Sequence, residues 1–231
     1  MAYTMIKAKP ISYGGTRPLS AVQYIVIHYT ACKGDTARNE CNCFKYVNTR
    51  AAGAHFFADQ FGDVCQSIPI KRVAWSVGGA KWDNNGGSLY GVATNYNTVS
   101  IELCDLVDKA PSEAMTESVR KLVAYIQKKC PNAKTIIRHW DVNGKPCPVT
   151  MIGTDCQAWF DFRKAISGSV SYKVKITKAV NVRKKASAKS EKIMTLMPGG
   201  VYTIVRESAN KKWGKLKSGA GWIRLSYTKK V

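Results

Sequence analysis

The segment from 138 to 148, RHWDVNGKPCP, limits how the rest of the chain can fold around it. It contains His139 and Cys147, and an imidazole and a thiolate are both good zinc ligands that together fill half of a tetrahedral site. Pro146 and Pro148 flank the cysteine, and each proline fixes its own φ and favours an extended backbone in the residue before it. The segment therefore predicts a stiff loop that carries part of a metal site and needs a further ligand from elsewhere.

Length and hydropathy suit globular domains. The chain has 231 residues, of which 45% are hydrophobic, so one medium-sized and one small domain can each form a core. It has no run of about 18 apolar residues, so no transmembrane segment is expected. The N-terminal residues contain no apolar stretch long enough for a signal peptide, which predicts a protein that stays in the cytoplasm of its host until it is released.

The eight cysteines all precede residue 157, and in a cytoplasm we expect them to be reduced. Most of them fit the role of small buried hydrophobic residues. Cys32, Cys41 and Cys43 are also a conceivable metal-binding set. However, Cys41 falls on the apolar face of a predicted helix, so core packing suits it better.

The charge is strongly positive and uneven. The formal net charge is +21, and residues 167–231 hold 16 Lys or Arg against 2 Asp or Glu. A module this basic usually binds a polyanion. The candidates are nucleic acid, an anionic cell wall and a membrane surface.

Residues 1–166 alternate predicted strands with predicted helices. Apolar runs predict strands at 23–28, 54–58, 64–68, 97–103 and 135–138. Amphipathic spacing predicts helices at 36–48, from 116 to about 130, and at 155–166. The expected N-caps are Asp35, Thr116 and Thr154, the last in a capping box with Gln157. This pattern predicts an α/β domain with a central mixed β-sheet flanked by helices.

Two polar side chains occur within these apolar strands. His28 ends a buried strand, at the edge of the sheet where α/β proteins bind ligands, although a core histidine bonded to backbone fits the same position. Glu102 lies between Ile101 and Leu103, where a carboxylate is costly unless it is paired, faces a cleft or lies near a metal. If that face of the strand meets solvent, Glu102 is an ordinary surface residue.

Two further positions have open interpretations. His55 stands at a strand start beside two phenylalanines and fits either a pocket or a structural role. Residues 72–91 read as a long loop, which inside a domain is usually functional. Its Trp75 suits either stacking on a sugar ring or anchoring the core.

Together, His28, His139 and Cys147 give three protein ligands with a fourth position open, as in catalytic zinc sites. Such a zinc ion lowers the pKa of a bound water to about 7. Glu102 is the candidate to deprotonate that water and pass the proton to a leaving amine. Lys145 is the candidate to stabilise the negative oxygen of a tetrahedral intermediate. These roles suit hydrolysis of an amide.

Six segments occur in a characteristic order: YIVIHYT at 24–30, GAHFF at 53–57, AWSVG at 74–78, VSIEL at 99–103, RHWD at 138–141 and KPCP at 145–148. In these segments the chain resembles, over roughly residues 20–166, the type 2 N-acetylmuramoyl-L-alanine amidases, which are zinc amidases related to peptidoglycan recognition proteins and many phage endolysins.

The resemblance implies zinc on His28, His139 and Cys147, with Glu102 and Lys145 as catalytic partners. It implies cleavage of the amide that joins the lactyl group of N-acetylmuramic acid to L-alanine of the stem peptide. Tyr29, His55 and Trp75 are the candidates for contacting this substrate.

The chain departs from some relatives at one catalytic position. These relatives carry a tyrosine that assists catalysis just before the histidine matching His55, and here that position is Ala54. Glu102 must then act as the base alone, or Tyr29 or another group must help. Other relatives use aspartate as third ligand where this chain has Cys147.

After a predicted linker at 167–171, short alternating strands with frequent turns predict a small β-barrel over 172–231. This part resembles bacterial SH3 domains in the segments VNVR at 180–183, PGG at 198–200, KWGKL at 212–216 and GWI at 221–223. The resemblance implies binding to cell-wall peptide or cross-bridge. The basic charge is expected to hold the module near anionic wall polymers.

These features predict a phage or prophage endolysin that degrades the Gram-positive cell wall and lyses the cell, after release from the host cytoplasm through a membrane pore. A bacterial autolysin of the same activity would more often carry an export signal, and a non-catalytic peptidoglycan-binding protein would lack Cys147. No nucleic-acid motif is visible in the basic module, so nucleic acid is not an expected partner. The predicted reaction requires no protein partner.

Overall fold

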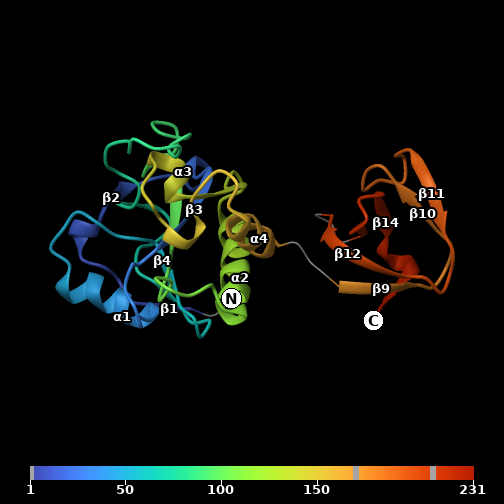
Figure 1. The fold of residues 1–231 in the computed structure, drawn as a ribbon, viewed down its shortest axis with the longest axis horizontal. Coiled ribbons are helices and arrows are strands. Elements are labelled where there is room, and N and C mark those ends of the chain that lie inside the picture. The colour runs from blue at the N-terminus through green and yellow to red at the C-terminus, as the bar shows by residue number, and fades with distance from the viewer. Residues whose placement is uncertain (1–2, 169–171, 209–211) are drawn as a thin grey trace. The chain divides into compact units, whose positions relative to one another are not determined.

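The structure is a computed structural model that describes residues 3–168, 172–208 and 212–231. The chain divides into two compact units, Met1–Ser167 and Gly168–Val231 (Figure 1). Residues 169–171 of the predicted linker lie outside the described residues. In the described ranges, no helix combines the length and the hydrophobicity that crossing a membrane requires.

A six-stranded mixed sheet forms the centre of the N-terminal unit, as predicted. Its strand order is β1-β5-β4-β7-β3-β8, in which only β5 and β4 pair antiparallel. A separate pair joins β2 to β6, a strand inside the segment predicted as a loop. The strands are β1 (Thr4–Met5), β2 (Tyr13–Thr16), β3 (Tyr24–Tyr29), β4 (Phe56–Ala58), β5 (Val64–Gln66), β6 (Arg72–Ala74), β7 (Thr98–Leu103) and β8 (Thr135–Arg138).

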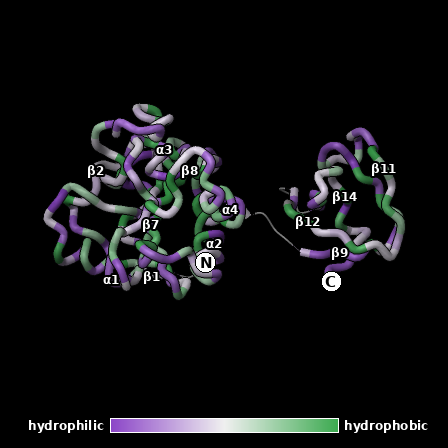
Figure 2. Tube along the Cα trace, in the orientation of Figure 1, coloured by the Kyte–Doolittle hydropathy of each residue, from purple (hydrophilic) through white to green (hydrophobic). Residues whose placement is uncertain are grey.

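Helices cover both faces of this sheet. Helix α2 (Glu113–Lys129) packs with α4 (Gln157–Ile166) against one face, and α1 (Ala37–Asn42) contacts β4 and β5. Successive side chains of a strand point to opposite faces, and Phe56 joins the core under α2 whereas Phe57 joins the core under α1. Hydrophobic and hydrophilic residues alternate along α2 and α4 in Figure 2, as expected for helices with one buried side.

The predicted N-caps of α1 and α2 are wrong by one and four residues. Ser112, rather than Thr116, caps α2, and its Oγ accepts a hydrogen bond from the Met115 N–H at 3.0 Å. Thr36, rather than Asp35, caps α1. Several neighbouring polar residues suit a cap equally, so composition alone does not select the one at which the helix starts.

Two other helix boundaries also differ from the prediction. The helix predicted at 36–48 changes from α1 to a π-helical turn over Cys43–Val47. Helix α4 starts at Gln157 without a side-chain cap, and the Thr154 hydroxyl instead donates to the carboxylate of Asp155. The predicted capping box is therefore wrong.

The C-terminal unit is all β, as predicted. It is an antiparallel sheet with the order β11-β10-β14-β13-β12-β9-β15, and alternate apolar residues of its strands form one core cluster. The strands are β9 (Tyr172–Ile176), β10 (Val180–Arg183), β11 (Lys192–Leu196), β12 (Val201–Glu207), β13 (Trp213–Leu216), β14 (Trp222–Arg224) and β15 (Thr228–Lys230).

A buried arginine links several backbone segments of the N-terminal unit. The Arg17 guanidinium donates to the carbonyl oxygens of Asn95 (2.8 Å), Thr98 (2.6 Å) and Ile70 (3.3 Å). Burial lowers the pKa of Arg17 to about 10, so the group remains positive at neutral pH.

His55, just before β4, is fully buried against this guanidinium. Its Nδ1 accepts from the Ser100 N–H (3.1 Å), and its Nε2 lies 3.0 Å from the Arg72 carbonyl oxygen and 3.1 Å from Arg17 Nη2. Because Nη2 uses its hydrogens on other carbonyl oxygens, we infer that Nε2 carries the proton and donates it to Arg72. Burial and the charge of Arg17 lower the pKa of His55 to about 3.

We expect the stability contributed by this neutral histidine to fade in acid. The unfolded chain takes up a proton near pH 6.5 and the folded chain only near about 3, so protonation of the unfolded state lowers the free energy of unfolding as pH falls. In urea unfolding, the stability advantage of the wild type over His55→Gln should shrink by about 2 kcal/mol between pH 6.5 and about 4.5. An advantage that stays constant over this range would contradict a buried neutral His55.

Candidate functional site

Two neighbouring strands place His28 beside Glu102. Strands β3 and β7 run parallel, and His28 is the register partner of Glu102. The residues before them, Ile27 and Ile101, join the core under α2, so His28 and Glu102 point to the opposite face of the sheet. His28 Nδ1 lies 3.9 Å from Glu102 Oε1.

The loop after β8 places His139 and Cys147 at the same position. His139 opens the short helix α3 (His139–Asn143), which ends at Gly144 with a φ of 85°. A Cβ at Gly144 would lie 2.6 Å from Asn84 Oδ1, so only glycine fits both the backbone conformation and the space. The Trp140 N–H donates to the Cys147 carbonyl oxygen at 3.0 Å and closes the loop, whose Cys147–Pro148 peptide bond is cis.

A paired and buried arginine fixes both ends of this loop. Arg138 Nη2 donates to Asp141 Oδ1 at 2.7 Å, and the Arg138 backbone N–H donates to Asp141 Oδ2 at 2.7 Å. On its other side, Nη1 donates to the carbonyl oxygens of Met151 (2.5 Å) and Gly153 (3.0 Å). The guanidinium also lies 4.6 Å from the centre of the Trp140 ring. The positive charge of Arg138 is therefore compensated by Asp141. The hydrogen bonds of the Arg138 guanidinium connect the start of the loop to the residues that follow the loop.

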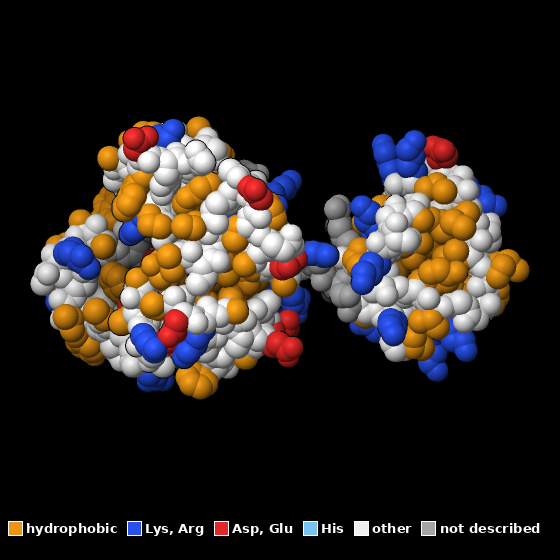
Figure 3. All heavy atoms as spheres, in the orientation of Figure 1, with side chains coloured by type: hydrophobic (Ala, Val, Ile, Leu, Met, Phe, Trp, Pro, Cys, Tyr) orange, Lys and Arg blue, Asp and Glu red, His pale blue; other side chains and the backbone are white. Residues whose placement is uncertain are grey.

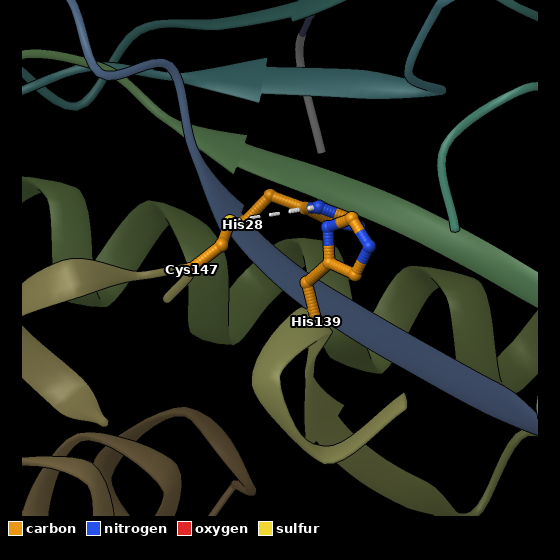
Figure 4. Close-up of side chains that lie close together, drawn as sticks. All are labelled: His28, His139 and Cys147. Carbon is orange, nitrogen blue, oxygen red and sulfur yellow. Dashed lines mark hydrogen bonds between the residues drawn. The ribbon is translucent and has the colours of Figure 1, made fainter. Parts of the chain in front are cut away.

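His28, His139 and Cys147 point toward one another in Figure 4. One ligand atom from each of the three lies within 4.8 Å of the others. The Cys147 Sγ is 3.8 Å from His28 Nδ1, and the centres of the two imidazole rings are 4.7 Å apart. The three residues are 2 to 4% exposed. The structure thus assembles the three predicted ligands into one buried cluster.

The hydrogen-bonding state of this cluster fits a metal ion. Among the described residues, His28 Nε2, both ring nitrogens of His139 and Glu102 Oε2 are buried without a hydrogen-bond partner. Burying such atoms unpaired costs on the order of 1–3 kcal/mol each, and coordination to a metal removes that cost at the ligand nitrogens. Two imidazoles and a thiolate are a donor set that zinc accepts, and three ligands leave a position open.

Burial also sets the protonation of these groups. Burial, then the charge of Lys145, lowers the pKa of His139 to about 4, and burial with the neighbouring His139 lowers the pKa of His28 well below its usual range. Both imidazoles are therefore neutral at physiological pH, which is the form that binds a metal. Burial raises the pKa of the Cys147 thiol, so this thiol must release a proton when it binds a metal.

Burial also changes the pKa of the Glu102 carboxyl group. Desolvation raises the pKa of its carboxyl to about 8, and the positive charge of Lys145 acts in the opposite direction. A cation at the three-ligand cluster would favour the carboxylate further. The Glu102 side chain is 20% exposed, so it reaches the open space in front of the cluster.

A cleft of about 650 Å³ opens over the cluster. Of the predicted catalytic and substrate-contacting residues, Glu102, Lys145, Tyr29 and Trp75 line it. His55 is not among the lining residues and lies in the interior instead. Ala54 is also buried, so its position offers no polar group to the cleft.

Further residues line the cleft, and several of them belong to the segments 53–57 and 74–78 or to the predicted functional loop 72–91. Asn95 Oδ1 accepts from the backbone N–H groups of Ser76 (3.0 Å) and Val77 (2.8 Å) and holds one wall in place. The sequence did not single out Asn95, because it lies in a loop without hydrophobic periodicity, which is the signal that sequence interpretation depends on. The additional lining residues are Phe44, Ala51, Ala52, Gly53, Ser76, Gly78, Gly79, Ala80, Trp82, Asn95 and Asn143.

Comparison with solved structures identifies related folds. PlyL superposes with a TM-score of 0.56 at 23% identity, over 74% of this chain and 100% of that chain. The catalytic domain of XlyA superposes with a TM-score of 0.54 at 20% identity, over 72% of this chain and 99% of that chain. A mutant endolysin from Bacillus subtilis superposes with a TM-score of 0.52 at 20% identity, over 72% of this chain and 99% of that chain. At these identities the likeness concerns the fold alone.

The amino-acid sequence is also similar to those of two curated proteins. N-acetylmuramoyl-L-alanine amidase CwlL of Bacillus licheniformis is 30% identical over 168 residues, which are 68% of this chain and 45% of that protein. A probable N-acetylmuramoyl-L-alanine amidase of the same species is 30% identical over 176 residues, 74% of this chain and 48% of that protein. The chain spans about half the length of the curated relatives it matches.

A sequence profile of one family covers both the strands and the loop that build the site. This profile, described as N-acetylmuramoyl-L-alanine amidase, matches residues 18–150, which is more than half of the chain. The predicted type 2 amidase family is thereby confirmed. The chain belongs to the type 2 N-acetylmuramoyl-L-alanine amidase family.

Proposed function

We propose that the chain is a zinc-dependent amidase that hydrolyses the bond between N-acetylmuramic acid and L-alanine in bacterial peptidoglycan. The observation that carries the proposal is the buried cluster of His28, His139 and Cys147, with Glu102 beside it at the base of an open cleft. Family membership supports the choice of substrate. Zinc held by the three ligands would supply Lewis-acid activation and lower the pKa of a bound water to about 7.

In this proposal Glu102 moves the proton. Its carboxylate accepts a proton from the water whose oxygen attacks the amide carbonyl carbon. When the carbon–nitrogen bond breaks, Glu102 gives this proton to the leaving nitrogen. The products are a carboxylate on the lactyl group and a free amine on L-alanine. The unpartnered Oε2 and the partial exposure of Glu102 suit a group that exchanges protons with a substrate in the cleft.

Other residues of the cleft position the substrate and its charge. Lys145 is exposed at the cleft and supplies a positive charge for the oxygen that becomes negative during attack. Trp75 is 37% exposed and offers an aromatic face to a sugar ring, and the half-buried Tyr29 also lines the cleft. In this assignment no base is needed at Ala54.

We expect Glu102→Gln to separate metal binding from catalysis. The amide of glutamine cannot accept the proton, so release of L-alanine amino termini from purified cell walls should fall at least about 100-fold. The zinc content should stay at the wild-type level. Cys147→Ala should lose both the activity and the zinc of this cluster, because it removes one of three ligands.

Cys156→Ser is the matched control, since Cys156 is a free, partly exposed thiol outside the cluster. It should keep both activity and zinc. Full activity in Glu102→Gln or in Cys147→Ala would contradict the proposed mechanism. Binding to walls by the wild type without new amino termini would identify a non-catalytic binding protein instead.

We further propose that the protein is a phage or prophage endolysin that stays in the host cytoplasm until a membrane pore gives it access to the Gram-positive wall. A fold shared with a solved endolysin supports this role. The second, basic β unit, which we propose to be SH3-like, suits attachment to the wall. Lys and Arg side chains surround the visible face of this unit, with few acidic groups (Figure 3).

Four exposed lysines follow one edge of the C-terminal sheet. In β9, Lys173 and Lys175 point outward while the residues between and after them are buried. Lys229 of β15 is the direct register partner of Lys175, with Lys230 next to it. Like charges opposite each other destabilise a sheet, so this arrangement suits a surface that meets an anionic polymer.

We expect Lys175→Glu combined with Lys229→Glu to weaken binding of the full chain to teichoic-acid-bearing walls about tenfold at low salt. The measurement is sedimentation with purified walls over a salt series, and the wild type should lose affinity as salt rises. Lys189→Glu combined with Lys192→Glu changes the same charge at exposed positions away from this edge and should have a smaller effect. Equal losses in the two double variants would contradict a localised anion-binding edge.

A further inference from the structure

A second group of metal-ligating side chains lies after the C-terminal end of β3. One ligand atom each from Cys32, Asp35 and Glu40 lies within 4.8 Å of the other two. Cys32 and Asp35 belong to the connection from β3 to α1, and Glu40 belongs to α1. None of the three lines the cleft. We propose that Cys32, Asp35 and Glu40 form a second metal site, for a thiophilic divalent cation such as Zn²⁺.

The state of Asp35 is the first independent support. Asp35 is only 9% exposed, and its Oδ1 accepts a hydrogen bond from the Asp105 N–H at 2.5 Å. Its Oδ2 is buried and has no hydrogen-bond partner in the part of the chain that the structure describes. An unpartnered buried carboxylate oxygen is costly, and a bound cation would compensate it.

Glu40 adds a second carboxyl group beside the first. One carboxyl oxygen of Glu40 lies within 4.8 Å of a carboxyl oxygen of Asp35. Two adjacent carboxylates repel each other unless a proton or a cation lies between them. With the Cys32 sulfur also within reach, a cation gains three ligands there, whereas a shared proton serves only the two carboxyl groups.

Two lysines in this region, Lys33 and Lys109, are paired with other carboxylates. Lys33, which follows Cys32, pairs with Asp108 at 2.7 Å, and Lys109 pairs with Asp105 at 2.5 Å. Their ammonium groups are therefore engaged with other carboxylates. The negative charge of Asp35 and Glu40 remains available to a cation.

The donor set selects the class of cation. One thiolate with two carboxylates suits zinc or cadmium, at about 2.3 Å to sulfur and about 2.0–2.2 Å to oxygen. Magnesium and calcium prefer oxygen ligands alone, so the thiolate excludes them as preferred occupants. Cys32 is exposed, so an ion reaches it without opening the fold. Three protein ligands leave one position for water.

The test counts bound metal in the full chain after removal of metal and reduction of thiols. Titration with Zn²⁺ against a chromogenic chelator should give two equivalents for the wild type. It should give one for Cys32→Ser, for Glu40→Gln and for Cys147→Ser, and none for the double cysteine variant. Cys156→Ser and Glu113→Gln are matched controls at other thiol and carboxylate positions and should keep two equivalents. With Co²⁺ as the probe, thiolate charge-transfer absorption should halve in either single cysteine variant.

Several results would overturn the second site. One is a wild type that binds a single equivalent lost only in Cys147→Ser. Another is a Cys32→Ser variant that still binds two. A third is a Cys32–Cys43 disulfide in the purified protein whose reduction restores no second equivalent. If the proposed zinc centre of the amidase is wrong instead, the result is distinguishable. The bound metal would then be lost in Cys32→Ser and would be unaffected in Cys147→Ser.

Discussion

The register between β3 and β7 is the constraint on which the site depends. Parallel pairing places His28 directly beside Glu102, and alternation along both strands directs the two side chains away from the core under α2. A slip of β3 by one residue would turn His28 into that core and expose Ile27 in its place, on the opposite side from Glu102. Burial of the apolar residues therefore fixes the register, and the register fixes the geometry of the polar pair.

The loop after β8 supplies the other half of the site, and polar interactions contribute to its shape beside the packing of Trp140 and Val142. The buried Arg138 holds the two ends of the loop through Asp141, Met151 and Gly153, and Gly144 allows the chain to turn where a side chain would collide. His139 and Cys147 thereby reach His28. Because the ring nitrogens of His139 have no partner among the described residues, the pocket is arranged around a group that binds nitrogen.

Much of this site could be predicted from the sequence because its residues interrupt strong patterns. His28 and Glu102 stand out in apolar strands, and His139 and Cys147 stand out in a proline-rich loop. The N-cap of α2 could not be predicted, since Ser112 and Thr116 both satisfy the local preference and tertiary contacts decide between them. The buried state of His55 depends on Arg17, far away in the chain, and no local signal reports that contact.

The spacing of cysteines in the sequence also could not predict which side chains lie together in the fold. The cysteines at 32, 41 and 43 read as a conceivable metal set, but Cys41 is buried in the core, as its place on the apolar face predicted. The partners that the fold brings to Cys32 are the carboxyl groups of Asp35 and Glu40. Backbone geometry at the start of α1, rather than residue type, decides which ligands converge.

X-ray absorption at the zinc edge tests the central claim most directly. The Cys32→Ser variant loaded with one equivalent of zinc isolates the buried cluster. The account predicts a shell of two imidazole nitrogens, one sulfur at about 2.3 Å and one light atom from solvent. A shell without sulfur, or without imidazole scattering, would contradict zinc binding by His28, His139 and Cys147.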